Sequence, residues 1–282
     1  MFRLLFFVLP LLLVGNLCGQ VGLDIKMARQ QFIPHEAVNL SIQLTNITGS
    51  PLSLYGDPQR SWLNIYVTNE RGEKVLPYNQ LDFGRTEIPT GNTVAKPVDL
   101  NAYFPIYRLG SYSAHVVVVL PSGEAFQSRS ITFNTTYGRT VFESRIGLGE
   151  KARDFRLISF APGNDNYLYF QAEMVQEQQV ALTYPISRML SSKKVEALFD
   201  QKSNLNVLFL AAPNRYRHII IDTRGQVINQ EIYTRSPSGQ PRLIGFANGD
   251  VKIAGGLAFN AKEAQEREAK IKGVSERPTS LY

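Results

Sequence analysis

Alternation of apolar and polar residues is the feature that most restricts the fold of this chain. Val38, Leu40, Ile42 and Leu44 are separated by single polar residues, so one face of the segment is apolar and the other is polar. The same period of two recurs along the chain between turns rich in glycine, proline and asparagine. No segment with a helical period interrupts it before residue 137. These patterns predict an all-β protein made of antiparallel strands.

Residues 21–137 are predicted to form an antiparallel β-sandwich, because short strands alternate with turns and one face of each strand is apolar. The predicted strands are 37–46, 62–67, 98–103, 112–120 and 125–133. The alternation also predicts which side chains fill the core of the sandwich. They are Leu40, Ile42, Trp62, Ile65, Tyr112 and Val116.

Two motifs in this region resemble bacterial immunoglobulin-like domains. Residues 44–52 are similar to the segment in which a strand, an asparagine, a turn, a proline and a second strand follow one another. Residues 109–114 look like the entry into a strand whose tyrosine, here Tyr112, packs at a corner. Trp62 begins a central strand, as a core tryptophan often does in those domains. The resemblance implies an immunoglobulin-like fold but no particular function, since this sandwich serves many unrelated roles.

Residues 138–260 contain three similar units, each with a short strand, a polar turn and a second strand. The second strands begin at Tyr167, Leu205 and Val251, and the middle unit continues into a four-stranded meander. This interval resembles the blades of a β-propeller. Two and a half units are too few to close a propeller, so we predict a partial, propeller-like antiparallel domain. The only helical signal within it is short, at residues 187–194.

The first 19 residues have the pattern of a secretory signal peptide. Arg3 precedes an apolar run from Leu4 to Val14, and small or polar residues follow it up to Gly19. The run is shorter than the roughly 20 residues of a membrane-spanning helix. We therefore expect cleavage near Gly19, export to the periplasm or the medium, and no membrane span. At the other end, residues 261–282 are predicted to be a short helix followed by a loose tail.

Cys18 is the only cysteine, so the exported chain would contain no thiol. This excludes cysteine nucleophiles, thiolate metal sites and disulfide-stapled modules from the exported part, and it suits a bacterial envelope. A lipid anchor on Cys18 is the less favoured alternative, because Leu17 occupies a position where a lipobox has a small residue.

The charge pattern argues against a nucleic-acid partner. The chain has 30 basic and 24 acidic residues, and residues 138–261 hold 15 basic against 11 acidic. The excess is spread along the sequence and forms no dense basic stripe with interleaved aromatic residues, which a nucleic-acid face would show.

No motif for catalysis, a metal or a cofactor is present, so we predict no catalytic residues and no cofactor. The three histidines, His35, His115 and His218, occur without a hydrolase or metal-ligand pattern. His218 and Asp222 are the best fragment of a catalytic site. Four residues apart on a strand, however, they would be roughly 13 Å apart.

The remaining functional signal is the set of tyrosines in the second region. Tyr167, Tyr169 and Tyr216 are the candidate partner-binding residues, because a tyrosine row on an exposed sheet can stack on sugars or hold a peptide. The sequence favours a non-catalytic exported binding or structural module whose partner is a protein or glycan of the envelope. Two alternatives remain open. One is a secreted hydrolase or carbohydrate-active enzyme whose site forms only in three dimensions, and the other is a sandwich that acts as a chaperone or protease inhibitor.

Overall fold

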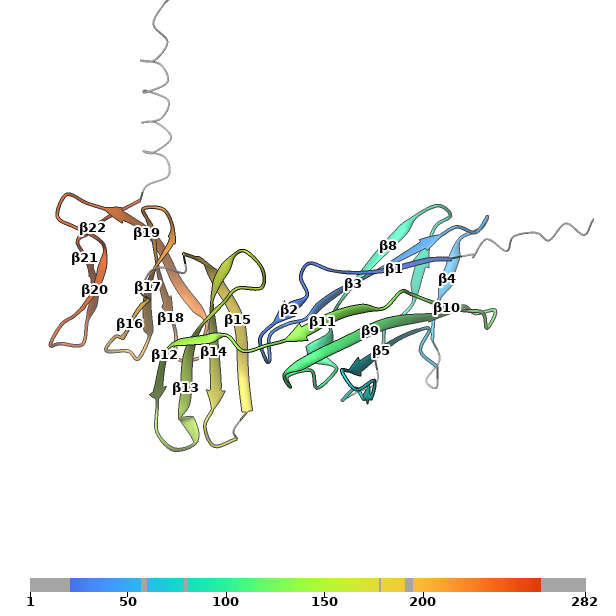
Figure 1. Ribbon diagram of the computed structural model, residues 1–282, viewed down its shortest axis with the longest axis horizontal. Helices are drawn as coiled ribbons and strands as arrows, with labels where there is room; N and C mark the ends of the chain where they lie inside the picture. Colours follow the sequence, from blue (N-terminus) through green and yellow to red (C-terminus); the bar gives the residue numbers. More distant parts are fainter. Residues whose placement is uncertain (1–20, 57–59, 79–80, 178, 191–194, 260–282) are drawn as a thin grey trace, which may run out of the picture.

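The computed structural model describes residues 21–56, 60–78, 81–177, 179–190 and 195–259. Within these ranges it contains twenty-two β-strands and two short 3-10 helices, which confirms the predicted all-β class. The predicted signal peptide and the predicted C-terminal helix lie outside the described residues. The strands form two groups of sheets, one ending at Thr135 and the other beginning at Arg139 (Figure 1).

The first group is a sandwich of two sheets. One sheet has the strand order β1-β3-β8 and the other β2-β11-β9-β5-β6, with β10 also paired to β9, while β4 and β7 form a separate ribbon. Of the described pairs in this group, only that of β2 with β11 is parallel. The bounds are β1 Val21–Met27, β2 Gln31–Phe32, β3 Asn39–Asn46, β4 Leu52–Leu54, β5 Leu63–Asn69, β6 Lys74–Val75, β7 Thr86–Ile88, β8 Thr93–Asp99, η1 Leu100–Ala102, β9 Gly110–Val119, β10 Ala125–Gln127 and β11 Ile131–Thr135.

The core of the sandwich lies between the two sheets and follows the alternation. On β3, Leu40, Ile42 and Leu44 are fully buried, whereas the polar residues between them are partly exposed. Burial of one face is what favours a strand here, since the apolar area removed from water stabilises the fold. The six predicted core residues are all buried, so this prediction is confirmed.

The second group contains two larger antiparallel sheets and one hairpin. Their orders are β12-β13-β14-β15, β16-β17-β18-β19-β22 and β20-β21. The three predicted strand–turn–strand units are confirmed as the antiparallel pairs β13–β14, β16–β17 and β20–β21. The bounds are β12 Arg139–Ile146, η2 Gly149–Lys151, β13 Arg153–Phe160, β14 Asn166–Met174, β15 Gln179–Met189, β16 Glu196–Phe199, β17 Leu205–Ala212, β18 Arg215–Ile221, β19 Val227–Arg235, β20 Arg242–Gly245, β21 Val251–Ala254 and β22 Gly256–Ala258.

The two larger sheets share one core. Phe155 and Phe170 of the first sheet meet edge to face, with ring centroids 4.9 Å apart, and pack with Phe209 and Ile219 of the second. The opposite face of the second sheet is partly covered by the hairpin β20–β21, through Leu243. Figure 1 shows this hairpin at the end of the stack farthest from the sandwich.

Two local predictions were wrong. Ser187 lies in β15 and pairs with Leu168 of β14 instead of starting a helix, because the ladder to β14 outweighs local propensity. The predicted strand 98–103 is shifted, since β8 already ends at Asp99. The Asp99 carboxylate there accepts a hydrogen bond from the Asn101 amide at 3.0 Å and caps a 3-10 turn.

Candidate functional site

Tyr169 lies at the contact between the two groups of sheets. Its side chain is only 1% exposed and packs with Ile158 and Phe160 of β13 and with Ile33, which follows β2. Its hydroxyl accepts a hydrogen bond from Arg29 Nη1 at 2.7 Å. Burial, assisted by the nearby Glu36 carboxylate, raises the pKa of Tyr169 far above its ordinary value, so the hydroxyl stays protonated. Tyr169 therefore links the two groups and is not exposed, contrary to the prediction that it presents an open binding surface.

Arg29 joins this tyrosine to a buried carboxylate. The guanidinium forms an ion pair with Glu36, whose side chain is almost completely buried. The other carboxylate oxygen accepts a hydrogen bond from the Ile33 amide at 3.2 Å. The guanidinium also stacks over the Phe32 ring, 4.6 Å from its centroid. Each polar group of this cluster has a partner, as a buried charge requires.

Tyr167 shares its face with Tyr169, as predicted, and is only partly buried. It borders a cavity of about 670 Å³ between the loop at Arg29 and the turn before β14. Asp165 also lines this cavity, but its carboxylate is paired with Arg188 at 2.7 Å. Of the three candidate tyrosines, Tyr167 alone keeps an accessible surface.

Tyr216 is 7% exposed and lies under the hairpin β20–β21 with Leu208, Leu210 and Leu243. Its hydroxyl is 3.1 Å from Gln240 Oε1, to which it donates. The structure therefore places Tyr216 in a core and far along the chain from Tyr167, so the predicted set of three is not assembled on one exposed surface.

His218 and Asp222 do not form a catalytic pair, because each is engaged elsewhere. Buried His218 places Nε2 3.1 Å from Asn206 Oδ1, and its Nδ1 has no partner among the described residues. The Asp222 carboxylate accepts hydrogen bonds from the amides of Arg224 and Gln226, which close the turn after β18. These hydrogen bonds are typical of an aspartate that stabilises a turn.

We expect His218 to make the protein less stable in mild acid. Burial lowers the pKa of His218 below 6.5, and the Glu231 carboxylate opposite it offsets this only in part. Because the unfolded chain binds the proton more tightly, the free energy of unfolding falls as the pH drops through 6.5 toward the folded pKa. In the variant His218→Gln this fall should be shallower in urea titrations at several pH values. His35, whose pKa burial also lowers, contributes to the part that remains. An identical pH profile for the variant would contradict this assignment.

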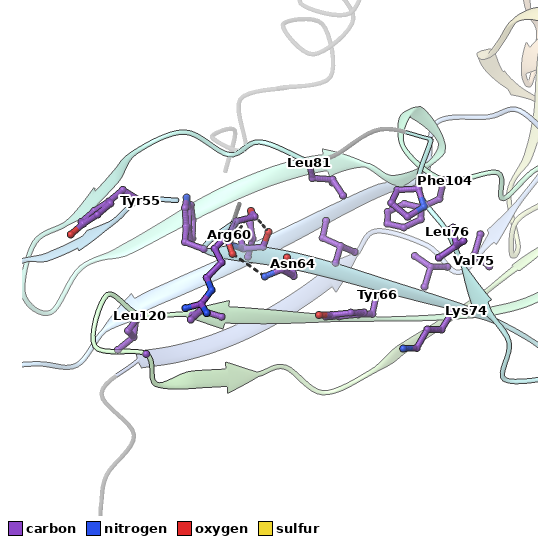
Figure 2. A pocket seen from close by; sticks show the side chains of 18 of the residues that line it. Tyr55, Arg60, Asn64, Tyr66, Lys74, Val75, Leu76, Leu81, Phe104 and Leu120 are labelled. Carbon is purple, nitrogen blue, oxygen red and sulfur yellow. Dashed lines mark hydrogen bonds between the residues drawn. The ribbon is translucent and has the colours of Figure 1, made fainter. Parts of the chain in front are cut away.

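A groove of about 820 Å³ runs along β5 in the sandwich (Figure 2). Its floor is β5, and its walls come from the segment after β6 and from the turn between β9 and β10. The lining residues are Tyr55, Arg60–Val67, Lys74–Pro77, Leu81, Phe104, Val119–Pro121 and Gly123.

The groove follows a strand edge that is only partly paired. On one side β5 pairs with β9 along its full length, from Leu63 to Asn69. On the other side β6 pairs only with Val67 and Thr68. Among the described strands, none pairs with Leu63–Tyr66 on that second side. This stretch therefore presents an open sheet edge.

Pro77 explains why β6 stops. Val67 faces Val75, so continued antiparallel pairing would bring Pro77 opposite Ile65. Proline has no amide hydrogen and cannot donate to the carbonyl of Ile65. The chain leaves the sheet after Val75, and no described strand pairs with the backbone groups of Ile65 on this side.

The described lining of the groove combines exposed apolar side chains with polar and basic ones. Leu76 is 74% exposed, and Tyr66 is 41% exposed and stacks on His115 with ring centroids 5.1 Å apart. Figure 2 shows the side chains of Arg60, Tyr66 and Lys74 in a row along β5. Among the described residues that line the groove, Arg60 and Lys74 are the charged ones.

No protein-family model matches this chain, and no curated protein matches it either. Among the described residues, none of the helices has the length and apolar character that crossing a membrane requires. The same residues bring together no group of three or more histidine, cysteine, aspartate or glutamate side chains able to hold a metal ion.

The sequence pattern did not predict the groove, because the residues of β5 at its floor alternate as in any half-buried strand. Alternation identified Trp62 and Ile65 as core residues, which is correct, but it carries no information about the neighbours of each edge. Pro77, three residues after the charged Lys74, was the available signal. A proline soon after a short strand marks an edge that cannot continue.

Proposed function

We propose that this protein is an exported, non-catalytic binding module of the bacterial envelope, and that the groove along β5 is its partner-binding surface. The observation that carries the proposal is the open edge of β5 between exposed apolar side chains. Native proteins usually shield such an edge with charges, proline or a covering element, because it otherwise recruits other strands. Leu63–Tyr66 itself contains neither a charge nor a proline, although Lys74 and Pro77 lie in the lining beside it, and we propose that this stretch is open to a partner.

The sandwich supports the proposed immunoglobulin-like identity of residues 21–137. The order β1-β3-β8 opposite β6-β5-β9-β11 follows the arrangement in which the first, second and fifth main strands face the third, sixth and seventh. The Tyr112 hydroxyl donates to the Arg108 carbonyl at 2.8 Å, as a tyrosine corner does. Buried Trp62 immediately precedes β5 and donates from Nε1 to the Gly84 carbonyl.

We propose that residues 138–260 form a partial propeller-like domain. In this proposal, the face of its first sheet that is next to the sandwich is covered by the sandwich. The two four-stranded meanders pack face to face, as neighbouring blades do. Ile33 of the sandwich covers the outer face of the first meander, and the hairpin β20–β21 stands where a third blade would begin. This arrangement supports a structural role for the second domain and a binding role for the first.

We expect the exported protein to begin near Gln20 or Val21. Intact-mass spectrometry of material recovered from the periplasm or medium should give the mass of a chain cut near Gly19, because the leader has a charged start and a short apolar run. Full-length mass, or the added mass of a lipid on Cys18, would contradict the proposal of a free exported protein.

The binding role is tested by a photo-crosslinking amino acid placed at Leu76, on the wall of the groove. In the native host, this position should give a discrete adduct with one envelope protein. The matched control is the same amino acid at Leu148, an exposed leucine in the loop after β12. Equal adducts from both positions, or none from Leu76, would remove the support for a binding surface at the groove.

A further inference from the structure

We propose that the cavity between the loop at Arg29 and the turn before β14 binds an uncharged saccharide. None of the described residues lines both this cavity and the groove along β5. The inference therefore goes beyond the proposed function, and it gives the second domain a binding role besides its structural one. The cavity has a volume of about 670 Å³. Sites for small ligands measure about 300–1,000 Å³ and often form between domains.

Both groups of sheets contribute to the walls of the cavity. The loop between β1 and β2 forms one wall, and the turn between β13 and β14 forms another. The floor is the face of β14 and β15 that is turned toward the sandwich. The described lining residues are Ala28, Arg29, residues 162–165, Tyr167, Tyr169 and Pro185. A ligand in the cavity would therefore contact both domains at once.

The floor is open because the sandwich covers only part of it. Tyr169 of β14 pairs with Pro185 of β15, yet Tyr169 is buried and Pro185 is exposed. Ile33 of the sandwich packs on Tyr169, so the cover ends between these two paired residues. The register of β14 and β15 also shifts just before Tyr169, and such a bulge bends a strand. The sheet is thus bent and partly uncovered where the cavity lies.

The charges in the described lining are balanced. Arg29 is paired with buried Glu36, and the Asp165 carboxylate lies 2.7 Å from the guanidinium of Arg188 on β15. A charged ligand would give up its water in a cavity whose charged side chains already have counterions, which is unfavourable. An uncharged ligand avoids this cost, so the lining favours one.

Several polar groups of the lining can still form hydrogen bonds. A guanidinium has five N–H donors, and Arg29 uses one for Tyr169 and one for Glu36. The ion pair of Asp165 is made by Oδ1, and a carboxylate has a second acceptor oxygen. The exposed side chain of Asn164 adds an amide that both donates and accepts. Hydroxyl groups suit this mixed set, because each can donate and accept as well.

Tyr167 supplies a flat apolar surface in the same cavity. Its side chain is only partly buried, and the face of an aromatic ring is slightly negative. This face attracts the C–H groups on one side of a sugar ring, while the hydroxyl groups at the edge of the sugar reach the polar side chains. A purely apolar ligand would leave those polar side chains without partners. The lining therefore favours a saccharide over an apolar ligand as well as over an ion.

The test titrates the exported protein with glucose, galactose and mannose by saturation-transfer NMR. We expect at least one of them to bind saturably and to raise the melting temperature with its concentration, because it binds the folded protein. Each sugar is compared with its uronate, in which a carboxylate replaces the hydroxymethyl group. The uronate of the sugar that binds should bind about fivefold or more weakly, because no free counterion awaits it.

Variants of the lining locate the site. Tyr167→Ala should weaken binding of that sugar about fivefold or more, and Tyr167→Phe should retain most of the affinity because it keeps the ring. Asn164→Ala, on the exposed turn, should weaken binding about threefold and serves alone if Tyr167→Ala does not fold. The matched control is Tyr78→Ala, which removes an exposed tyrosine outside the cavity and should leave binding unchanged.

Three results would overturn the assignment. They are the absence of saturable binding for all three sugars, unchanged binding in the folded lining variants, and equal or tighter binding of the uronates. None of these results bears on the groove along β5, which is tested separately by the adduct at Leu76. Failure of the adduct at Leu76 with saccharide binding intact would reject the groove alone.

Discussion

Arg29→Ala is expected to lower the free energy of unfolding by about 3–5 kcal/mol, the typical cost of removing one member of a buried ion pair. The Glu36 carboxylate would remain buried without its cationic partner, while it keeps the hydrogen bond from the Ile33 amide. The Tyr169 hydroxyl would lose its donor as well. Urea unfolding of the full exported chain, followed by far-ultraviolet circular dichroism, measures the change.

A double-mutant cycle separates the ion pair from simple loss of packing. Glu36→Gln combined with Arg29→Ala should cost clearly less than the sum of the two single substitutions, because the second change removes the charge that the first leaves unpaired. Tyr169→Phe should cost about 1.5–3 kcal/mol, since it deletes one hydrogen bond to a charged group. Strict additivity of Arg29→Ala and Glu36→Gln would show that the two side chains do not depend on each other.

Trp62→Ala is expected to cost about 3–5 kcal/mol, the range found when a large aromatic core residue is truncated. The indole is 3% exposed, lies edge to face with Phe83 and donates to the Gly84 carbonyl at 2.7 Å. Truncation would leave a cavity and an unpaired carbonyl. Loss of the single tryptophan removes the fluorescence signal, so circular dichroism is again the appropriate probe.

Trp62→Phe is the conservative partner of this experiment. It keeps much of the apolar contact and loses the indole N–H, so its cost should be well below that of Trp62→Ala. A loss smaller than about 1 kcal/mol for Trp62→Ala would mean that the side chain is accessible. Trp62 lines the groove, so that result would reopen it as a ligand contact.

Local patterns predicted much of this fold. Leu40, Ile42 and Leu44 are buried because strand geometry alone assigns them to one face. The hairpins β13–β14, β16–β17 and β20–β21 were found because each places its polar turn residues between two strands only a few positions apart. Such pairs depend on neighbouring residues, so they can be read from a short window of sequence.

The candidate tyrosines were misjudged because their surroundings come from distant parts of the chain. Tyr169 is covered by Ile33 and bonded by Arg29, 140 positions earlier. Tyr216 is covered by Leu243 from a later hairpin. Alternation tells which tyrosines share a face, but it does not tell what lies on that face. The groove was missed for a related reason. Alternation shows which residues form a strand, but it does not show whether another strand pairs with each of its edges.

The hairpin β20–β21 is an insertion between β19 and β22, two strands that pair directly with each other. Arg235 at the end of β19 pairs directly with Gly256 at the start of β22, so the excursion from residue 236 to 255 leaves and returns at points about 5 Å apart. A two-residue turn spans such a gap. Shortening the chain there would spare both meanders and expose Leu208, Leu210 and Tyr216. Further hairpins could also be inserted between β19 and β22 without breaking the pairing of these two strands, because the inserted segment begins and ends at neighbouring positions.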